Sequence, residues 1–128
     1  MNNKNIKLLL VDDDRFLLDM YMLKFKNSNV IVDTASGSMM ALTKLRAGEV
    51  YDIILLDIIM PILDGIELLT LIRKEKLAPT STIIMLTNQS DNIVKAEELD
   101  IDGYIIKANS IPSEVVVQVL DIYNKKIN

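Results

Sequence analysis

Two apolar runs in this sequence end in aspartates, and these aspartates are the side chains best suited to carry chemistry. Residues 53–56 lead directly to Asp57, and residues 6–11 lead to three consecutive aspartates at 12–14. A short and continuous apolar run suits a strand that is buried on both faces, as in a parallel sheet. Open parallel sheets bind their ligands beyond the carboxyl ends of the strands. We therefore expect these aspartates at a binding edge.

An aspartate that follows a strand can also have a purely structural role. Asp14 suits the N-cap of a helix that begins near Arg15, and Asp57 taken alone could be a cap or a turn residue. A cap needs only one residue, however, and adjacent like charges repel each other. The surplus of carboxylates after residue 11 therefore predicts a bound cation.

Two further strand ends add a hydroxyl and an ammonium group. The run 82–86 leads to Thr87, and the run 104–106 leads to Lys107. Carboxylate oxygens with open positions for water suit Mg²⁺, and a lysine with a hydroxyl can bind the oxygens of an anion. Phosphoryl transfer to a carboxylate needs a nucleophile, charge neutralisation and positioning. The collected residues predict a site of this kind.

Apolar runs alternate with segments of helical spacing, and together they define the elements that position these groups. We expect strands over 6–11, 30–32, 53–56, 82–86 and 104–106, and helices from 15 onward and over 38–47, 65–76, 91–99 and 112–126. The core face of the first helix is expected to contain Leu17, Met20, Tyr21 and Phe25. Right-handed crossovers favour a parallel sheet that is covered on both sides. The predicted fold is α/β, a doubly wound, flavodoxin-like sheet of five parallel strands in the order 2-1-3-4-5 with five helices.

Composition limits the classes of function that are open to the chain. Its 128 residues are 50% hydrophobic and 25% charged, which is typical of a folded domain, and we expect one domain over residues 1–128. The formal net charge is −4, and the lysines and arginines are scattered along the chain. Binding to a phosphate backbone requires a basic stripe, so direct nucleic-acid binding is not expected.

The residue types that are missing exclude further chemistry. The sequence has no cysteine, which excludes disulfides, thiol catalysis and thiolate metal sites. It has no histidine either, so no imidazole can act as a base, a metal ligand or a phosphate carrier. No apolar run approaches the ~18 residues of a membrane span, and the amino terminus does not resemble a signal peptide. We expect a cytoplasmic protein without membrane association.

Five short motifs occur in the order and spacing of a known family. They are LLVDDD at 9–14, LLDIIMP at 55–61, DG at 64–65, LT at 86–87 and GYIIK at 103–107. With these motifs, the chain resembles the receiver domain of two-component response regulators, the CheY-like family, over essentially its whole length. The resemblance implies that a histidine kinase or a histidine phosphotransfer protein delivers a phosphoryl group from phosphohistidine to Asp57.

The same resemblance assigns roles to the residues around Asp57. Asp12 and Asp13 would hold Mg²⁺ together with Asp57 and the main-chain carbonyl of Ile59. Thr87 would contact the phosphoryl group, Lys107 would pair with it, and Tyr104 would be the aromatic residue that moves with Thr87. The chain would promote only its own phosphorylation and dephosphorylation, so we do not expect an enzyme.

An acyl phosphate adds close to two negative charges, and the contacts that it makes would shift the population between two packings. The surface expected to respond comprises the helix 91–99, the strand 104–106 and the helix 112–126. A downstream protein target would read this surface, and phosphorylation could also drive formation of a homodimer. The sequence leaves open whether the chain acts alone or belongs to a longer regulator.

Three positions depart from the pattern of the family. Ala108 follows Lys107 where the family usually has proline, commonly with a cis bond. A cis bond before alanine would cost about 3 kcal/mol, so we expect a trans bond and a different orientation of the Lys107 side chain. Ile62 replaces a frequent glycine after Pro61, which makes that loop bulkier. Ile59 places an apolar side chain beside the phosphoryl site, and we expect a phosphorylated form of moderate to long lifetime.

Two alternative functions fit part of the pattern. A phosphatase of the haloacid dehalogenase type would use Asp12 as nucleophile and Asp14 as general acid. That family prefers glycine or threonine after the second aspartate and carries a cap for which 128 residues leave no room, and Asp57 would have no role. The other alternative is a scaffold that keeps the fold but is not phosphorylated. The complete set of acids argues against a scaffold, whereas the change at Ala108 is compatible with one.

Overall fold

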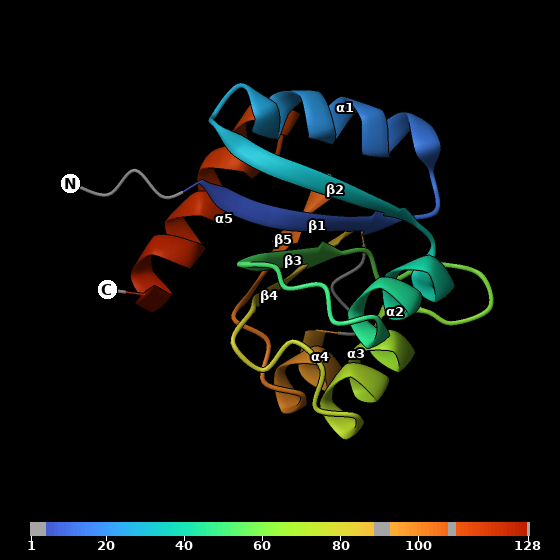
Figure 1. Ribbon diagram of the computed structural model, residues 1–128. Helices are drawn as coiled ribbons and strands as arrows, with labels where there is room; N and C mark the ends of the chain where they lie inside the picture. Colours follow the sequence, from blue (N-terminus) through green and yellow to red (C-terminus); the bar gives the residue numbers. More distant parts are fainter. Residues whose placement is uncertain (1–4, 89–92, 108–109, 128) are drawn as a thin grey trace.

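Strands and helices alternate five times along the chain. The computed structural model describes residues 5–88, 93–107 and 110–127 (Figure 1). The strands are β1 (Ile6–Asp12), β2 (Val30–Ser36), β3 (Ile53–Leu56), β4 (Thr82–Thr87) and β5 (Gly103–Ile106). The helices are α1 (Arg15–Lys26), α2 (Ser38–Arg46), α3 (Gly65–Lys74), α4 (Ile93–Glu98) and α5 (Pro112–Ile127). The predicted succession of elements is confirmed, and residues 91–92 of the predicted fourth helix lie outside the described residues.

The five strands form one parallel sheet in the order β2-β1-β3-β4-β5. This result confirms the predicted fold class and strand order. The order in which strands are added changes side at β1: β2 lies on one side of it, and β3, β4 and β5 follow on the other. Between β1 and β3, Val11 lies opposite Leu56 in the register. All four residues of β3 are buried, as expected for a central strand with a continuous apolar sequence.

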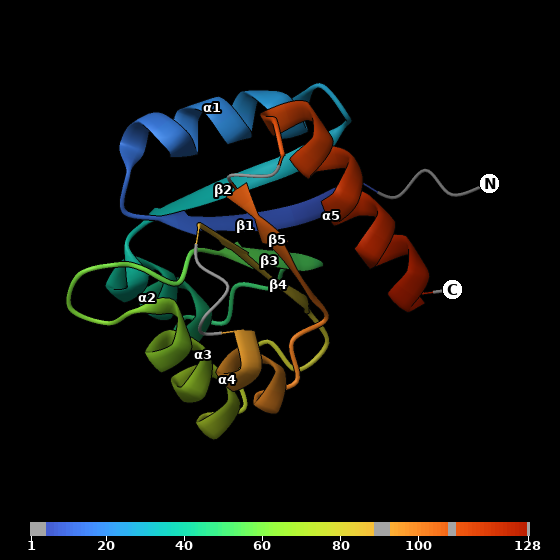
Figure 2. The ribbon, with the colours of Figure 1, turned by 180° about the vertical axis from the view of Figure 1, so that it is seen from behind.

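Helices cover both faces of the sheet, as the two opposite views in Figures 1 and 2 show. Helices α1 and α5 lie on one face, and α2, α3 and α4 lie on the other. Side chains of a strand point alternately to the two faces, so Leu8 and Leu10 join the core beneath α1 and α5 while Leu9 and Val11 join the core beneath the other three helices. Both cores are therefore built from the same apolar strands.

Local hydrogen bonds define where the helices begin. Asp14 caps α1, because its Oδ1 atom accepts hydrogen bonds from the N–H groups of Phe16 (2.9 Å) and Leu17 (3.3 Å). Asp64 and Glu67 form a reciprocal capping box at the start of α3, with N–H···O distances of 2.8 and 2.9 Å. Both arrangements satisfy N–H groups that have no partner within the helix.

Most predicted bounds agree to within two residues, and the larger differences are the length of β2 and the buried face of α1. Strand β2 extends to Ser36 rather than ending at residue 32. In α1, Leu18 is buried together with Tyr21 and Phe25, whereas the predicted core residues Leu17 and Met20 are only partly buried at the margin of the same core. The core face of α1 is therefore centred on Leu18, Tyr21 and Phe25, with Leu17 and Met20 beside it.

In the part of the chain that the structure describes, no helix is long and apolar enough to cross a membrane.

Candidate functional site

The sheet topology places the two acidic strand ends next to each other. β1 and β3 are hydrogen-bonded neighbours, and the N–H of Asp57 donates to the carbonyl of Val11 at 3.1 Å. Asp12 is the last residue of β1, and Asp57 follows the last residue of β3. The acidic ends of β1 and β3 therefore lie side by side, as predicted, at the point where the strand order changes side.

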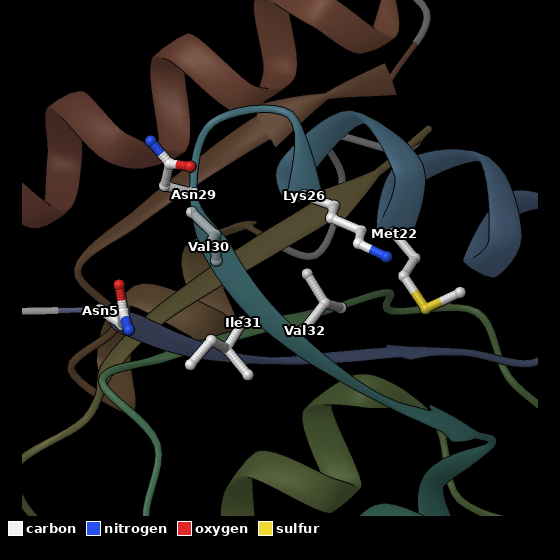
Figure 3. Close-up of a pocket in the computed structure, with 7 residues that line it drawn as sticks. All are labelled: Asn5, Met22, Lys26, Asn29, Val30, Ile31 and Val32. Atoms are coloured by element: carbon white, nitrogen blue, oxygen red, sulfur yellow. The ribbon is translucent and has the colours of Figure 1, made fainter.

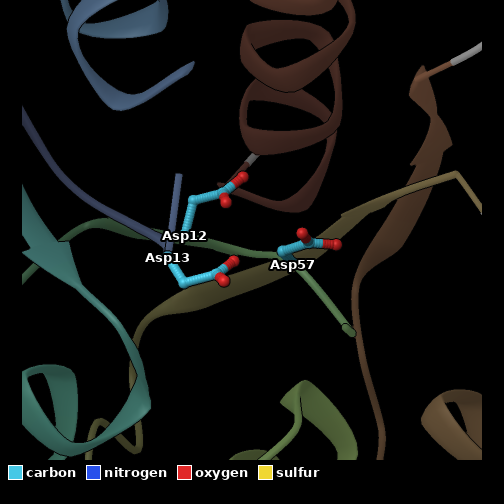
Figure 4. A group of neighbouring side chains, drawn as sticks. All are labelled: Asp12, Asp13 and Asp57. Carbon is cyan, nitrogen blue, oxygen red and sulfur yellow. The ribbon is translucent and has the colours of Figure 1, made fainter. Parts of the chain in front are cut away.

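Asp12, Asp13 and Asp57 face one common space (Figure 4). One carboxylate oxygen from each of the three residues lies within 4.8 Å of the others. Asp12 is buried, Asp57 is half-buried and Asp13 is exposed, so the group opens from the sheet edge toward solvent. The carboxylates are thus directed at one point rather than capping separate helices.

Lys107 reaches this group from the end of β5. Its Nζ atom donates to Oδ2 of Asp12 at 3.0 Å and to Oδ2 of Asp57 at 3.3 Å. The other oxygen of each carboxylate accepts a backbone hydrogen bond, from Asp14 N to Asp12 Oδ1 (3.0 Å) and from Ile58 N to Asp57 Oδ1 (2.8 Å). These contacts hold both carboxylates in a defined orientation.

Burial and the nearby charges change the acid–base properties of the site. Burial raises the pKa of Asp57; Lys107 opposes this effect, and the charge of Asp12 adds to it. Burial alone would lower the pKa of Lys107, but the carboxylates of Asp57 and Asp12 outweigh it, so the pKa of Lys107 is raised. Lys107 therefore remains a cation, while Asp57 as an anion is less stable than an exposed aspartate.

The hollow around these groups is lined by Asp12, Asp13, Asp14, Leu17, Asp57, Ile59, Asn88 and Lys107. The sequence did not single out Asn88 or Leu17 as site residues. Asn88 directly follows Thr87, so its position just beyond a strand end was the signal that could have indicated it. Leu17 lies in the first turn of α1, and the sequence predicted it only as a core residue of that helix.

The remaining predicted residues lie around the hollow at different depths. Ile59 lines it, and its side chain is 54% exposed. Thr87 is completely buried at the end of β4. Tyr104 lies on the edge strand β5 opposite Met85 and is 46% exposed. The roles predicted for these three residues, including metal binding by the carbonyl of Ile59, remain predictions, and Ala108 lies outside the described residues.

The loop from β3 to α3 returns to the acceptor strand. The N–H of Gly65 donates to the carbonyl of Ile58 at 2.6 Å. A Cβ atom at residue 65 would overlap the carbonyl oxygen of Asp57 and lie 2.8 Å from Cα of Ile58. Glycine is required here because the backbones approach each other so closely.

The donor set is suited to a hard divalent cation. The group has three carboxylates, and the ammonium group of Lys107 pairs with two of them, Asp12 and Asp57, which leaves an excess of negative charge in a partly buried space. All of the side-chain ligands available from the aspartates are oxygens, and the exposed side of the hollow leaves room for water. This combination fits Mg²⁺, which binds one or two carboxylates and keeps several waters.

A second hollow lies between α1 and β2, away from the aspartates (Figure 3). Its lining consists of Asn5, Met22, Lys26, Asn29, Val30, Ile31 and Val32. It contains one lysine, two amides and apolar side chains, and no carboxylate. The combination of acids and lysine needed for phosphoryl transfer is therefore found at the carboxyl edge of the sheet and not in this hollow.

The family model for the response regulator receiver domain matches residues 8–119. This chain belongs to the response regulator receiver domain family. It is 43% identical over 119 residues to the transcriptional regulatory protein ResD of Bacillus subtilis, covering 88% of this chain and 46% of that protein. It is 36% identical over 123 residues to the alkaline phosphatase synthesis transcriptional regulatory protein PhoP of the same organism, covering 94% of this chain and 50% of that protein. The receiver domain thus spans about half the length of these relatives.

Solved structures show the same fold. A CheY-like response regulator receiver domain protein from Methanospirillum hungatei superimposes with a TM-score of 0.84 at 26% identity, covering 95% of this chain and 96% of that one. The receiver domain of the Francisella response regulator 1452 gives a TM-score of 0.81 at 27% identity, covering 95% and 99%.

Family membership establishes the general function. The chain is a receiver domain of the two-component type, a signalling switch that depends on a phosphorylatable aspartate. The same matches support this function over a phosphatase of the haloacid dehalogenase type.

Proposed function

We propose that Asp57 is the phosphoacceptor of this receiver domain and that a histidine kinase or a histidine phosphotransfer protein is the donor. The observation that carries the proposal is the convergence of Asp12, Asp13, Asp57 and Lys107 at one sheet edge. Asp57 is the carboxylate at the end of the central strand β3, and it is half-buried and open to the hollow. The 128 residues contain no histidine, so the phosphohistidine must come from outside this receiver domain.

The transfer needs the carboxylate oxygen of Asp57 to attack phosphorus while the bond from phosphorus to the donor imidazole nitrogen breaks. The leaving electron pair stays on that nitrogen. Lys107 is held within 3.3 Å of Asp57 and can neutralise an oxygen of the arriving phosphoryl group. The hydrogen bond from Ile58 N to Asp57 Oδ1 orients the carboxylate for the attack.

Asp12, Asp13 and Asp57 would hold Mg²⁺, with the main-chain carbonyl of Ile59 as a further ligand. When bound there, the ion would supply charge neutralisation for the phosphoryl oxygens and for the crowded carboxylates. Asp12 is already oriented by Asp14 N and Lys107. We expect these three clustered acids, rather than the acids elsewhere on the chain, to give the site its affinity for magnesium.

Phosphorylation would change the surface formed by α4, β5 and α5. Thr87 ends β4 and is buried, so a movement of its side chain toward the phosphoryl group leaves space next to β5. Tyr104, which is 46% exposed on β5, would turn into that space. The new surface would bind a downstream protein or a second copy of the chain.

Several broader expectations accompany this proposal. ResD and PhoP are named as transcriptional regulatory proteins, and both are about twice as long as the matched part. For the chain itself, the net charge of −4 favours a protein target over nucleic acid. One domain over residues 1–128 and a cytoplasmic location also remain expectations.

The proposal is tested with acetyl phosphate and Mg²⁺, followed by intact-mass measurement and mapping of the modified residue. The native chain should gain one phosphoryl group on Asp57, and Asp57→Asn should gain none. Asp52→Asn is the matched control, because Asp52 lies just before β3 and Asp57 just after it, and it should be labelled like the native chain. Labelling of Asp57→Asn, or mapping of the phosphate to Asp12, would overturn the assignment.

A further inference from the structure

Ile62 lies at the tip of the loop between β3 and α3 in an unusual conformation. Its φ angle is +72°, in the left-handed region that β-branched residues rarely adopt. The N–H of Leu63 donates to the carbonyl of Pro61 at 2.9 Å, which closes a γ-turn around Ile62, and γ-turns with positive φ are rare and strained. The side chain of Ile62 is also 85% exposed. Both the backbone and the exposure are unfavourable for isoleucine in the free protein.

The residues on either side hold Ile62 in this conformation. Met60 is buried, with 6% exposure, and Leu63 packs against the same core. Pro61 has a restricted φ angle, and the hydrogen bond from Gly65 to Ile58 closes the base of the loop. The chain between two anchored residues must therefore turn tightly at residue 62. Strain of this kind persists only where the surrounding structure imposes it, and it concentrates at functional sites.

Other exposed apolar side chains lie on the segments that line the hollow of the acidic group. Ile59 lines the hollow and is 54% exposed. Phe16 is 75% exposed in the first turn of α1, next to Leu17, which lines the hollow. Ile62 follows Ile59 in the loop after β3, and these three exposed apolar residues, Phe16, Ile59 and Ile62, are called the apolar rim here because each lies on a segment that contributes to the lining of the hollow.

The position of the apolar rim limits what can cover it. A protein that delivers a phosphoryl group to Asp57 must bring its phosphorus to bonding distance inside the hollow, so its surface must cover the edge of the hollow. Without Mg²⁺ the acids at the centre repel an anionic donor, and bound Mg²⁺ would attract small and large anionic donors alike, so a preference for a protein donor has to come from elsewhere. Apolar contact at the rim can supply it, because burial of exposed apolar surface favours association. Acetyl phosphate is small enough to enter the hollow without this contact.

We propose that Ile62 is an anchor for an apolar surface of the protein phosphodonor and that it favours protein donors over small-molecule donors. This inference rests on the proposed role of Asp57 as phosphoacceptor. The γ-turn holds the isoleucine side chain outward before the donor arrives, so little conformational freedom is lost on binding. The donor surface that it fits is apolar and close to the phosphohistidine.

The experiment compares two phosphodonors on four variants of the full chain. One donor is a purified histidine phosphotransfer domain that carries phosphohistidine, and the other is acetyl phosphate. Ile62→Ala removes most of the side chain and keeps the left-handed backbone, Ile62→Gly removes the side chain and relieves the backbone, and Ile62→Leu keeps an apolar side chain. Ile31→Ala is the matched control, because Ile31 is 50% exposed on β2 beside the other hollow.

Transfer from the phosphotransfer domain should slow about tenfold or more in Ile62→Ala and Ile62→Gly, as for loss of an interface anchor. It should stay close to the native rate in Ile62→Leu and Ile31→Ala. Labelling by acetyl phosphate should be unchanged in all four variants. Ile62→Gly should also melt at a higher temperature than Ile62→Ala, because glycine adopts positive φ without strain.

Native rates of protein transfer in Ile62→Ala would overturn the inference. A loss of the same size with acetyl phosphate would also overturn it, because Ile62 would then act on the acidic group rather than on the donor. Failure of acetyl phosphate to label Asp57 in the native chain would instead overturn the proposed function. The two proposals can therefore fail separately.

Discussion

At the amino-terminal edge of the sheet, Asp52 and Asp102 are each matched to a backbone N–H group. Oδ2 of Asp52 accepts from Lys7 N at 2.9 Å, and Oδ2 of Asp102 accepts from Ile83 N at 2.8 Å. Asp102 also accepts from Nζ of Lys126 at 3.1 Å. Each acid at this edge joins two neighbouring strands, since β1 neighbours β3 and β4 neighbours β5.

At the carboxyl edge, the acids are concentrated instead of distributed. Asp12, Asp13 and Asp57 lie within 4.8 Å of one another and have Lys107 in common through its pairs with Asp12 and Asp57. Opposite charge favours an ionised carboxylate and like charge disfavours it. The amino-terminal acids therefore stabilise the free fold, whereas the carboxyl-edge acids repel one another, as expected of the proposed binding site before its ligands are bound.

The largest expected effect compares one acid from each edge. Asp102→Ala should lower the free energy of unfolding by about 3 kcal/mol, because the Ile83 N–H loses its acceptor in a part-buried position and Lys126 loses its carboxylate. Asp13→Ala, measured without Mg²⁺, should be neutral or stabilising, because it removes a negative charge from a crowded group. Urea unfolding followed by circular dichroism measures both. Equal losses of unfolding free energy in the two variants would contradict the difference between the two edges.

Bound Mg²⁺ should offset the repulsion among the carboxylates at the carboxyl edge of the sheet. At a concentration ~50-fold above its dissociation constant, the ion should stabilise the native chain by about 2 kcal/mol. Asp13→Asn should lose most of this gain, while Asp102→Asn should keep all of it despite its lower starting stability. The measurement is the melting temperature across a Mg²⁺ titration. An equal response in the two variants would place the ion elsewhere.

A smaller effect should appear in the pH dependence of stability without magnesium. Because burial raises the pKa of Asp57 in the folded protein, its ionised form costs stability as pH rises above the pKa of an unfolded aspartate, about 4. Lys107 remains paired with Asp12 when Asp57 is replaced. Asp57→Asn should thus melt at a higher temperature than the native chain at neutral pH.

This advantage of Asp57→Asn should shrink as pH falls through the raised pKa of the folded Asp57 carboxyl toward the pKa of an unfolded aspartate, about 4. Thermal melts at several pH values in a chelating buffer test it. A native chain that melts at the same temperature as Asp57→Asn throughout would show that the raised pKa has no consequence for folding.

The central part of the fold and of the site could be predicted because it depends on local pattern. The run at 53–56 became β3 with the predicted bounds, since a buried central strand is apolar at every position. The carboxyl ends of parallel strands share one edge, so Asp12, Asp57 and Lys107 could be placed together before any distance was known. The proximity of Asp12 and Asp57 follows from strand order, whereas Lys107 comes from β5, beyond β4, and reaches them with its long side chain.

Features that depend on distant partners could not be predicted. β2 continues beyond residue 32 through Asp33, whose carboxylate is paired with Nζ of Lys44 at 3.0 Å and with the hydroxyl of Tyr51 at 2.6 Å. In the sequence, Asp33 looks like the end of the strand because its two partners lie 11 and 18 positions further along the chain. The left-handed backbone of Ile62 could not be foreseen either, because it is imposed by the anchored residues on both sides.

The closed base of the β3–α3 loop makes the position of the Asp57 carboxylate independent of the side chains at the tip of the loop. Gly65 is joined to Ile58 at the foot of the loop, and Ile62 is at its tip. Substitutions at the tip can therefore alter recognition while the reactive carboxylate keeps its position. Such a layout allows one chemical centre to be adapted to different upstream proteins, so that pathways within one cell can remain insulated from each other through a few loop side chains.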